Sequence, residues 1–302
     1  MMHHPSLQRD SANLIGGAWK PLAGDSLVSR NPAHPDRIIW SGGPVVSAVD
    51  EAVGAAKAAA GAWEAWGLDK RVGALREFAK LATARVDALT ALIRDEVGKP
   101  MWDAKAEAQL LASKVDITLD QGPDGSFKRV MGFELALGGT KGGRCWFKPH
   151  GVMAVLGPFN FPAHLPNGHI VPALLLGNTV VLKPSDKTPA VGQFLAELYH
   201  EALESSGAPK GVVNLVQGGV DVAGALAGHE DIDGVLFTGS WNVGRRIMQA
   251  NMDRPGRVLA LEMGGNNPAV IMPDADIRQA VIECVRCAFI TSCLLYTSPS
   301  PR

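Results

Sequence analysis

The first half of the chain has apolar residues at the spacing of helices that bury one face. Short extended segments come first, near 13–19 and 29–33, where Gly-Gly and Asn-Pro interrupt any helical period. The pattern after them predicts helices over 47–66, 69–97 and 101–117. Ser47 and Asp50 are expected to cap the first helix, and Gly98-Lys99-Pro100 ends the second.

The pattern changes after Gly151, where short apolar runs alternate with helical segments. Strands are expected at 152–156, 180–182, 212–216, 235–237, 258–261 and 269–272, and helices at 163–176, 188–206, 220–228, 241–250 and 276–290. This rhythm predicts an α/β fold, a Rossmann-like parallel sheet with crossover helices. A β-hairpin is expected within 128–148. Ligands of such sheets bind beyond the carboxyl ends of the strands.

Composition favours a globular enzyme and gives no support to nucleic-acid or membrane partners. The 302 residues include 29 basic and 30 acidic side chains. No apolar stretch is long enough to cross a membrane and no secretory signal is recognised, so a cytoplasmic location is expected. The cysteines are expected to be thiols, and Cys284 with Cys287 lack the further ligands of a zinc site. No metal is expected.

Two segments that follow predicted strands carry candidate chemistry. In Gly157-Pro158-Phe159-Asn160-Phe161-Pro162, prolines restrain the backbone on both sides of Asn160, whose amide suits a developing oxyanion. The alternative is an asparagine that caps the local turn. In Lys183-Pro184-Ser185-Asp186, a lysine and a carboxylate suit ribose hydroxyls, and the carboxylate disfavours a 2′-phosphate. The alternative there is a solvated charged loop.

Two later segments add a phosphate site and an acid. Phe237-Thr238-Gly239-Ser240-Trp241-Asn242-Val243-Gly244 runs from a strand into a helix, where free amides and the helix dipole bind phosphate. Gly218, in the preceding loop, is a weaker signal. Glu262 stands at a strand end among glycines and amides, and partial burial there would suit a general base. The alternative is an acid satisfied by backbone donors.

In this order and spacing, the segments resemble the aldehyde dehydrogenase superfamily over residues 13 to 290. Within it, the strings 149–176 and 261–268 are similar to N-succinylglutamate 5-semialdehyde dehydrogenases. The resemblance implies NAD-dependent oxidation of an aldehyde, N-succinyl-L-glutamate 5-semialdehyde, to N-succinyl-L-glutamate in arginine catabolism. Another semialdehyde substrate, or a non-catalytic NAD-binding module, remains the alternative. A small-molecule aldehyde and a homo-oligomer of the full-length parent are the implied partners.

The resemblance also implies residue roles. Asn160 supplies half of the oxyanion hole, Glu262 activates the deacylating water, and Phe159 walls the substrate tunnel. The implied cofactor contacts are Lys183 and Asp186 at the adenosine ribose, Gly239 and Ser240 at the pyrophosphate, Gly244 at a close helix approach and Gly218 beside the adenine. Asp186 stands where the family usually has glutamate, which puts the strength of NAD binding in question.

The resemblance further implies a domain division. An NAD-binding domain covers 1–127 and 149–261, an oligomerisation hairpin covers 128–148, and 262–290 begins a truncated catalytic domain. The family's nucleophilic cysteine follows the glutamate by about thirty-four residues, where this chain has Tyr296. Cys293 lacks the family's flanking sequence. Residues 293–302 are therefore expected to be a non-native tail, and the chain to be inactive.

Overall fold

A central sheet organises the computed structural model, which describes residues 10–122, 125–265 and 268–289. Within these residues the sheet has seven strands, in the order β11 (Val258–Glu262), β10 (Gly234–Thr238), β7 (Val152–Leu156), β8 (Thr179–Lys183), β9 (Val213–Leu215), β1 (Ala12–Ile15) and β2 (Ala18–Pro21). Strands β7 to β11 pair in parallel, and β1 joins β9 antiparallel. The predicted α/β fold with a parallel sheet is confirmed.

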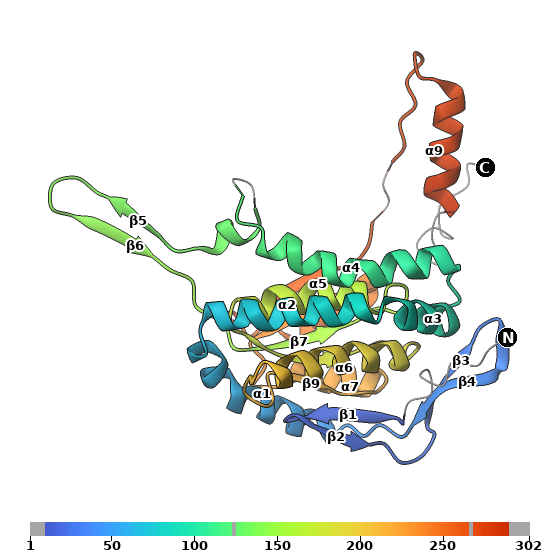
Figure 1. The fold of residues 1–302 in the computed structure, drawn as a ribbon, viewed down its shortest axis with the longest axis horizontal. Coiled ribbons are helices and arrows are strands. Elements are labelled where there is room, and N and C mark those ends of the chain that lie inside the picture. The colour runs from blue at the N-terminus through green and yellow to red at the C-terminus, as the bar shows by residue number, and fades with distance from the viewer. Residues whose placement is uncertain (1–9, 123–124, 266–267, 290–302) are drawn as a thin grey trace.

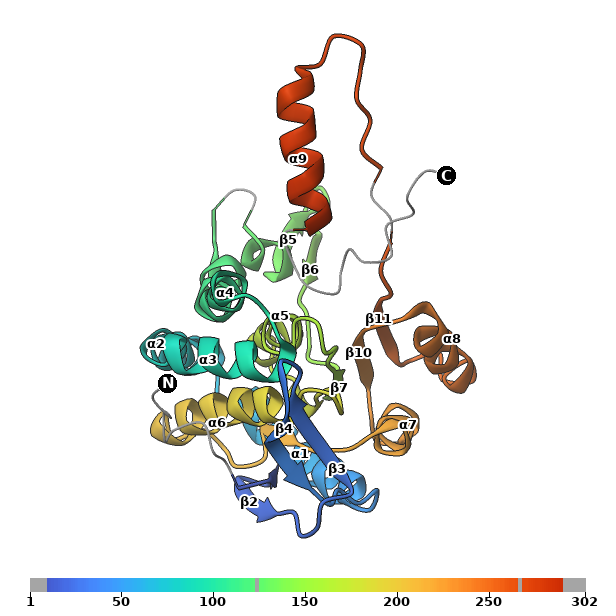
Figure 2. The same ribbon diagram turned by 90° about the vertical axis from the view of Figure 1, so that its right-hand side faces the viewer.

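The strands are apolar on both sides because helices cover both faces of the sheet (Figure 2). Alternate side chains of β7 point to opposite faces: Met153 joins one hydrophobic cluster and Ala154 the other. The Met153 cluster packs under the crossover helices α5 (His164–Leu175) and α6 (Pro189–Ser205). The Ala154 cluster packs under α1 (Ala48–Ala65), α7 (Val220–Gly228) and α8 (Trp241–Ala250).

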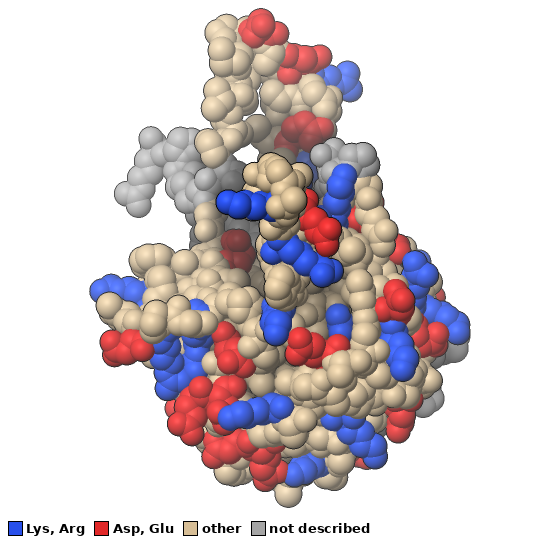
Figure 3. Space-filling view, turned by 90° about the vertical axis from the view of Figure 1, so that its left-hand side faces the viewer, with Lys and Arg blue, Asp and Glu red and all other residues tan. Residues whose placement is uncertain are grey.

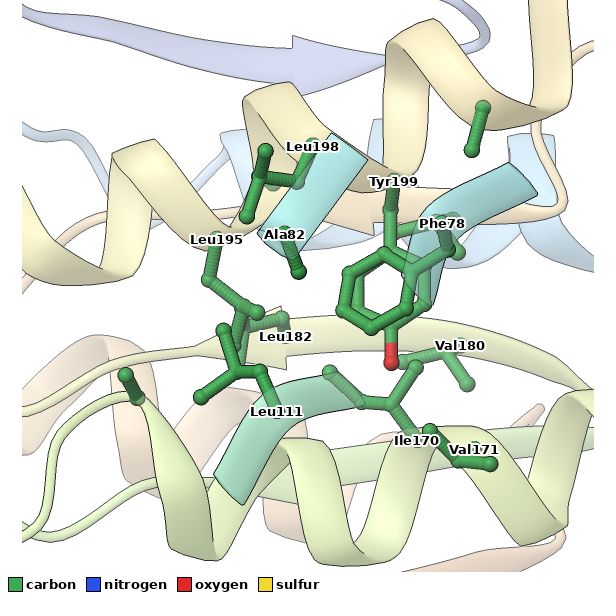
Figure 4. Packing of buried hydrophobic residues seen from close by; sticks show 14 of the residues in the cluster. Phe78, Ala82, Leu111, Ile170, Val171, Val180, Leu182, Leu195, Leu198 and Tyr199 are labelled. Carbon is green, nitrogen blue, oxygen red and sulfur yellow. The ribbon is translucent and has the colours of Figure 1, made fainter. Parts of the chain in front are cut away.

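A further helical layer covers α5 and α6. It consists of α2 (Leu68–Ala84), α3 (Val86–Val97) and α4 (Met101–Leu119). Phe78 of α2 stacks on Tyr199 of α6, with ring centroids 4.0 Å apart and planes inclined by 10° (Figure 4). The buried Tyr199 hydroxyl donates a 2.6 Å hydrogen bond to Asn167 of α5, which satisfies its polar end. Burial raises the pKa of Tyr199 well above its ordinary value.

Three local predictions were wrong. The single helix expected over 69–97 is two helices, because the chain turns at Arg85, which forms an ion pair with Glu201 of α6. Residues 269–272 form no strand, since no described strand pairs with them and Val270 is exposed. Ser47 has helical backbone angles and its side chain makes no capping hydrogen bond.

Smaller elements extend beyond this body. The predicted hairpin is confirmed as β5 (Phe133–Ala136) and β6 (Gly142–Cys145), which project from the molecule after the 3-10 turn η2 (Phe127–Val130) (Figure 1). Strands β3 (Leu27–Asn31) and β4 (His34–Gly42) form a second hairpin. Helix α9 (Ile277–Phe289) stands apart from the sheet (Figures 1 and 2). Oligomerisation through the β5–β6 hairpin and the proposed domain limits stay predictions.

The surface mixes both signs of charge. On the face that carries the hairpin, acidic and basic side chains are interspersed (Figure 3). Among the described residues, no helix is both long and apolar enough to span a membrane.

Gly151, which precedes β7, gives a test of this architecture. Its φ is +130°, and an added Cβ would overlap the Asp233 carboxylate, which accepts a 2.8 Å hydrogen bond from Val152. We expect Gly151→Ala to lower the free energy of unfolding by about 2 kcal/mol in urea denaturation. Gly54→Ala is the control, because nothing lies near that position in α1 and alanine favours the helix by about 0.5–1 kcal/mol. Equal stability of Gly151→Ala and the unmodified chain would contradict the prediction.

Candidate functional site

The candidate site lies where the sheet reverses its order. Strand β7 has β8 on one side and β10 on the other. The connection after β7 leads to β8 and the connection after β10 leads to β11, so the two diverge and leave a crevice at the carboxyl ends. A cavity of about 900 Å³ lies there, between the segments that follow β7 and β10. Five of the residues predicted from the sequence line this cavity: Phe159, Asn160, Gly239, Ser240 and Glu262. Lys183, Asp186, Gly218 and Gly244 lie outside its lining.

Asn160 caps its own turn and also lines the cavity. Its Oδ1 accepts a 3.1 Å hydrogen bond from the backbone N–H of Phe161, so the side chain does cap its own turn. That bond fixes the orientation of the amide, and no described residue bonds its Nδ2. The turn is anchored to β8, because Gly157 N donates a 3.0 Å bond to the carbonyl of Lys183. Asn160 therefore presents an oriented N–H donor on the cavity wall.

A buried ion pair holds the other end of this segment. Lys99 Nζ lies 2.9 Å from Glu107 Oε2 and 3.3 Å from the centroid of the Phe161 ring. Glu107 Oε1 accepts the amides of Ala163 and His164, at 3.0 and 3.2 Å. Burial raises the pKa of Glu107, against the opposing effect of Lys99. The pair thus joins α4 to the segment that carries Asn160, and we call it the Lys99–Glu107 clamp.

Sequence reasoning missed the clamp. Lys99 was interpreted only as part of a helix stop. A signal existed for Glu107, because it lies one turn from Ala104 and Leu111, on the apolar face of α4. An acid on the buried face of a helix indicates a buried partner. Which groups pair with Glu107 depends on how α4 packs against α5.

The four crossover helices differ at their N-termini. Glu107 caps α5, Glu96 accepts the first amides of α6 at 3.0 and 2.8 Å, and Asp221 lies in the first turn of α7. Helix α8 has no acidic residue in its first turn, and its cap is the uncharged Ser240, whose hydroxyl accepts from Val243 N at 3.4 Å. Among these helices α8 therefore leaves the positive end of its dipole available to a phosphate.

Two glycines shape this region. An added Cβ at Gly244 would overlap the Met263 side chain, so glycine allows α8 to lie close to the segment that follows β11. Gly218 follows β9 and has a φ of +149°, which disfavours other residues. These positions fit the roles implied by the resemblance, which stay predictions.

Lys183 ends β8 with its ammonium group largely buried. Burial lowers its pKa from 10.5 to about 8, although Asp186 opposes this effect. Asp186 is exposed and accepts a 3.3 Å hydrogen bond from the Ser185 hydroxyl. No described side chain forms an ion pair with Lys183. A buried cation without a protein partner is unfavourable, and a bound ligand would offset its cost.

Glu262 and Phe159 differ in how firmly they are held. Glu262 ends β11 directly opposite Thr238, and Gly264 N lies 3.4 Å from its Oε1. The partial burial considered for Glu262 is not found, because its side chain is exposed. The Phe159 ring packs under the Lys187 ammonium, at 4.4 Å from the centroid. Both side chains line the same cavity as Asn160.

Cysteines do not reach the cavity within the described residues. Cys145 lies on β6, and Cys284 and Cys287 lie on α9. The described part of the chain also contains no cluster of side chains that would hold a metal ion. Cys293, Tyr296 and the tail predicted for 293–302 lie outside the described residues.

Lys183→Met tests the cost of the buried cation. We expect the variant to be more stable than the unmodified chain at pH 7, by about 2 kcal/mol as an order of magnitude. Between pH 8 and 10.5 the unfolded chain binds more protons at Lys183 than the folded one, so the stability of the unmodified chain rises and the difference narrows. Urea denaturation at pH 7, 8, 9 and 10 measures this. A variant less stable at pH 7 would refute it.

The chain is similar in sequence to known aldehyde dehydrogenases. The model of the aldehyde dehydrogenase family matches residues 19–293. An N-succinylglutamate 5-semialdehyde dehydrogenase from Ectopseudomonas mendocina (strain ymp) is 43% identical over 283 residues, which are 93% of this chain and 56% of that protein. One from Sphingopyxis alaskensis is 46% identical over 272 residues, 89% of this chain and 53% of that protein. The chain therefore spans about half the length of these relatives.

Solved structures of aldehyde dehydrogenases are similar to this chain in fold. A NAD-dependent benzaldehyde dehydrogenase from Corynebacterium glutamicum has a TM-score of 0.82 and 29% identity over 94% of this chain and 61% of its own. An aldehyde dehydrogenase C mutant from Pseudomonas syringae, complexed with NAD+ and octanal, has a TM-score of 0.80 and 31% identity over 94% and 56%. A glyceraldehyde-3-phosphate dehydrogenase from Bacillus halodurans, complexed with NADP, has 0.80 and 30% over 93% and 58%. From the family match and this shared architecture, the chain belongs to the aldehyde dehydrogenase family.

Proposed function

We propose that this chain is the dinucleotide-binding part of an NAD-dependent aldehyde dehydrogenase. Its substrate is N-succinyl-L-glutamate 5-semialdehyde, which the full-length parent oxidises to N-succinyl-L-glutamate in arginine catabolism. One observation carries the proposal: an oriented amide at Asn160, a carboxylate at Glu262 and the positive end of α8, whose cap Ser240 is uncharged, all face one cavity. The names of relatives at 42 to 46% identity support this choice of substrate.

The residues present fit a nicotinamide dinucleotide. The positive end of α8 at Ser240 suits the pyrophosphate, and the buried Lys183 ammonium suits ribose hydroxyls. Gly239 lies beside the pyrophosphate in this proposal, while its own N–H donates to the Glu262 carbonyl at 2.9 Å. Asp186 places a negative charge beside Lys183, which favours NAD over a cofactor with a 2′-phosphate. Gly218 borders the adenine in this proposal. When bound, the nicotinamide ring accepts the hydride that the substrate releases.

In this proposal the chain's own side chains stabilise the oxyanion, activate water and exclude solvent. Asn160 Nδ2 donates to the substrate oxygen as negative charge develops there, and the Lys99–Glu107 clamp keeps the donor segment in place. Glu262 removes a proton from the water that hydrolyses the acyl intermediate. Phe159 excludes solvent from the cavity wall. The acyl intermediate itself forms on a cysteine in this family, and no described cavity residue is a cysteine.

The domain division follows the same proposal. Residues 1–127 and 149–261 bind the dinucleotide, the hairpin within 128–148 pairs subunits, and 262–290 begins the catalytic domain. The hairpin's exposed apolar side chains support a role in pairing; they are Phe133, Leu135 and Leu137.

Ser240→Asp tests the phosphate site. Aspartate is as good a helix cap as serine, so α8 is expected to stay folded, but its charge repels a pyrophosphate. We expect calorimetric titration to show NAD binding weakened at least about tenfold, with an unchanged melting temperature. Ser240→Asn, an uncharged cap, is the matched control and is expected to bind NAD nearly as well as the unmodified chain. The proposal fails if Ser240→Asp binds NAD as tightly as Ser240→Asn.

Substrate choice is tested by joining residues 1–290 to the remaining carboxyl-terminal part of the Ectopseudomonas mendocina relative. We expect this protein to form NADH from N-succinylglutamate 5-semialdehyde with a kcat/KM at least about tenfold higher than from succinic semialdehyde. The unjoined chain is expected to form none, because its described cavity offers no thiol. Equal kcat/KM values would refute the substrate, and NADH formation by the unjoined chain would refute its inactivity.

A further inference from the structure

His169 lies beside the proposed general base without having a role in the function proposed so far. It is on α5, and its Nε2 lies 3.1 Å from the Thr238 hydroxyl oxygen. Thr238 ends β10, and Glu262 ends β11 in the directly opposite register position. Side chains at paired positions of neighbouring strands point to the same face of a sheet. The Thr238 and Glu262 side chains therefore lie at neighbouring positions on one face of the sheet, the face that His169 contacts through Thr238.

The charges around His169 suit a proton acceptor. Burial lowers its pKa below 6.5, and Lys114 on α4 lowers it further. Glu262 on β11 acts in the opposite direction. The lowered pKa favours the neutral imidazole, whereas an ionised Glu262 stabilises the protonated form. The neutral ring accepts at Nε2 when its proton is on Nδ1, and the Thr238 hydroxyl is placed to donate to it.

We propose that His169 receives, through the Thr238 hydroxyl, the proton that Glu262 removes from water. The inference rests on the proposed role of Glu262 as general base. Within the described residues, the exposed Glu262 side chain has one hydrogen bond, a weak one from Gly264 N at 3.4 Å, so rotation toward Thr238 breaks little.

The transfer balances without an oxidant or reductant. As the water oxygen bonds to the acyl carbon, the π bond of the acyl C=O breaks and its electron pair moves to the oxygen held by Asn160, while one O–H bond of the water breaks and its proton passes to the Glu262 carboxylate. The Glu262 O–H bond then breaks as the Thr238 oxygen gains that proton, and the Thr238 O–H bond breaks as an N–H bond forms at His169 Nε2. Glu262 is again a carboxylate, Thr238 is again a hydroxyl, and His169 is an imidazolium whose charge the carboxylate stabilises.

The test measures the pKa of His169 by nitrogen-15 NMR in the 302-residue chain, with the His169→Gln spectrum as assignment. We expect Glu262→Gln to lower this pKa by about half a unit or more, because it removes the stabilising charge. Asp221→Asn is the matched control, an exposed carboxylate at the start of α7, and is expected to leave the pKa unchanged. An unchanged His169 pKa in Glu262→Gln would overturn the proposal.

Thr238→Val gives a second readout, because valine keeps the shape of threonine without its hydroxyl. We expect the Nε2 and Nδ1 chemical shifts of neutral His169 to show a changed tautomer ratio, which loss of packing alone would not produce. An unchanged ratio would contradict the relay. NAD titration separates this inference from the proposed function: His169→Gln is expected to bind NAD like the unmodified chain. Failure of the unmodified chain to bind NAD would refute the proposed function while leaving the measured coupling of His169 and Glu262 intact.

Discussion

The reversal of strand order at β7 is the constraint on which the site depends. Because β8 and β10 flank β7, the segments that follow β7 and β10 diverge and cannot fill the space between them. Apolar strands covered on both faces make this arrangement rigid, since neither face can shift without exposing a hydrophobic cluster. Asn160 and Ser240 face a common cavity for this reason, although eighty residues separate them.

At the carboxyl edge of the sheet, some helix N-termini are neutralised by acidic side chains and others are not. Glutamates cap α5 and α6 and thereby neutralise the positive N-terminal ends of these two helices. Helix α8 is left with an uncharged cap. Lys183 adds a buried cation that the fold itself does not pair. These features reduce the stability of the unliganded protein, as is common where binding residues are held away from water.

The Lys99–Glu107 clamp affects both the charge at a helix N-terminus and the shape of the site. Glu107 caps α5, and it also joins the Asn160 segment to α4, a helix of the outer layer. A buried pair of this kind contributes little net stability, because removing both charges from water is unfavourable. Its geometric effect is larger, since two amides, an aromatic ring and two charges must all be satisfied at one position.

By itself the sequence determined the parallel sheet, most helix positions and the motif residues at strand ends, because apolar periodicity and turn chemistry are local properties. It could not determine the turn at Arg85 or the exposure of Glu262, which depend on what packs beside them. The partners of Glu107 and His169 were likewise decided only in three dimensions. The Ala163 amide that Glu107 accepts and the Thr238 hydroxyl beside His169 lie 56 and 69 residues away from these side chains, and only the packing of helices on the sheet brings such residues within hydrogen-bond distance.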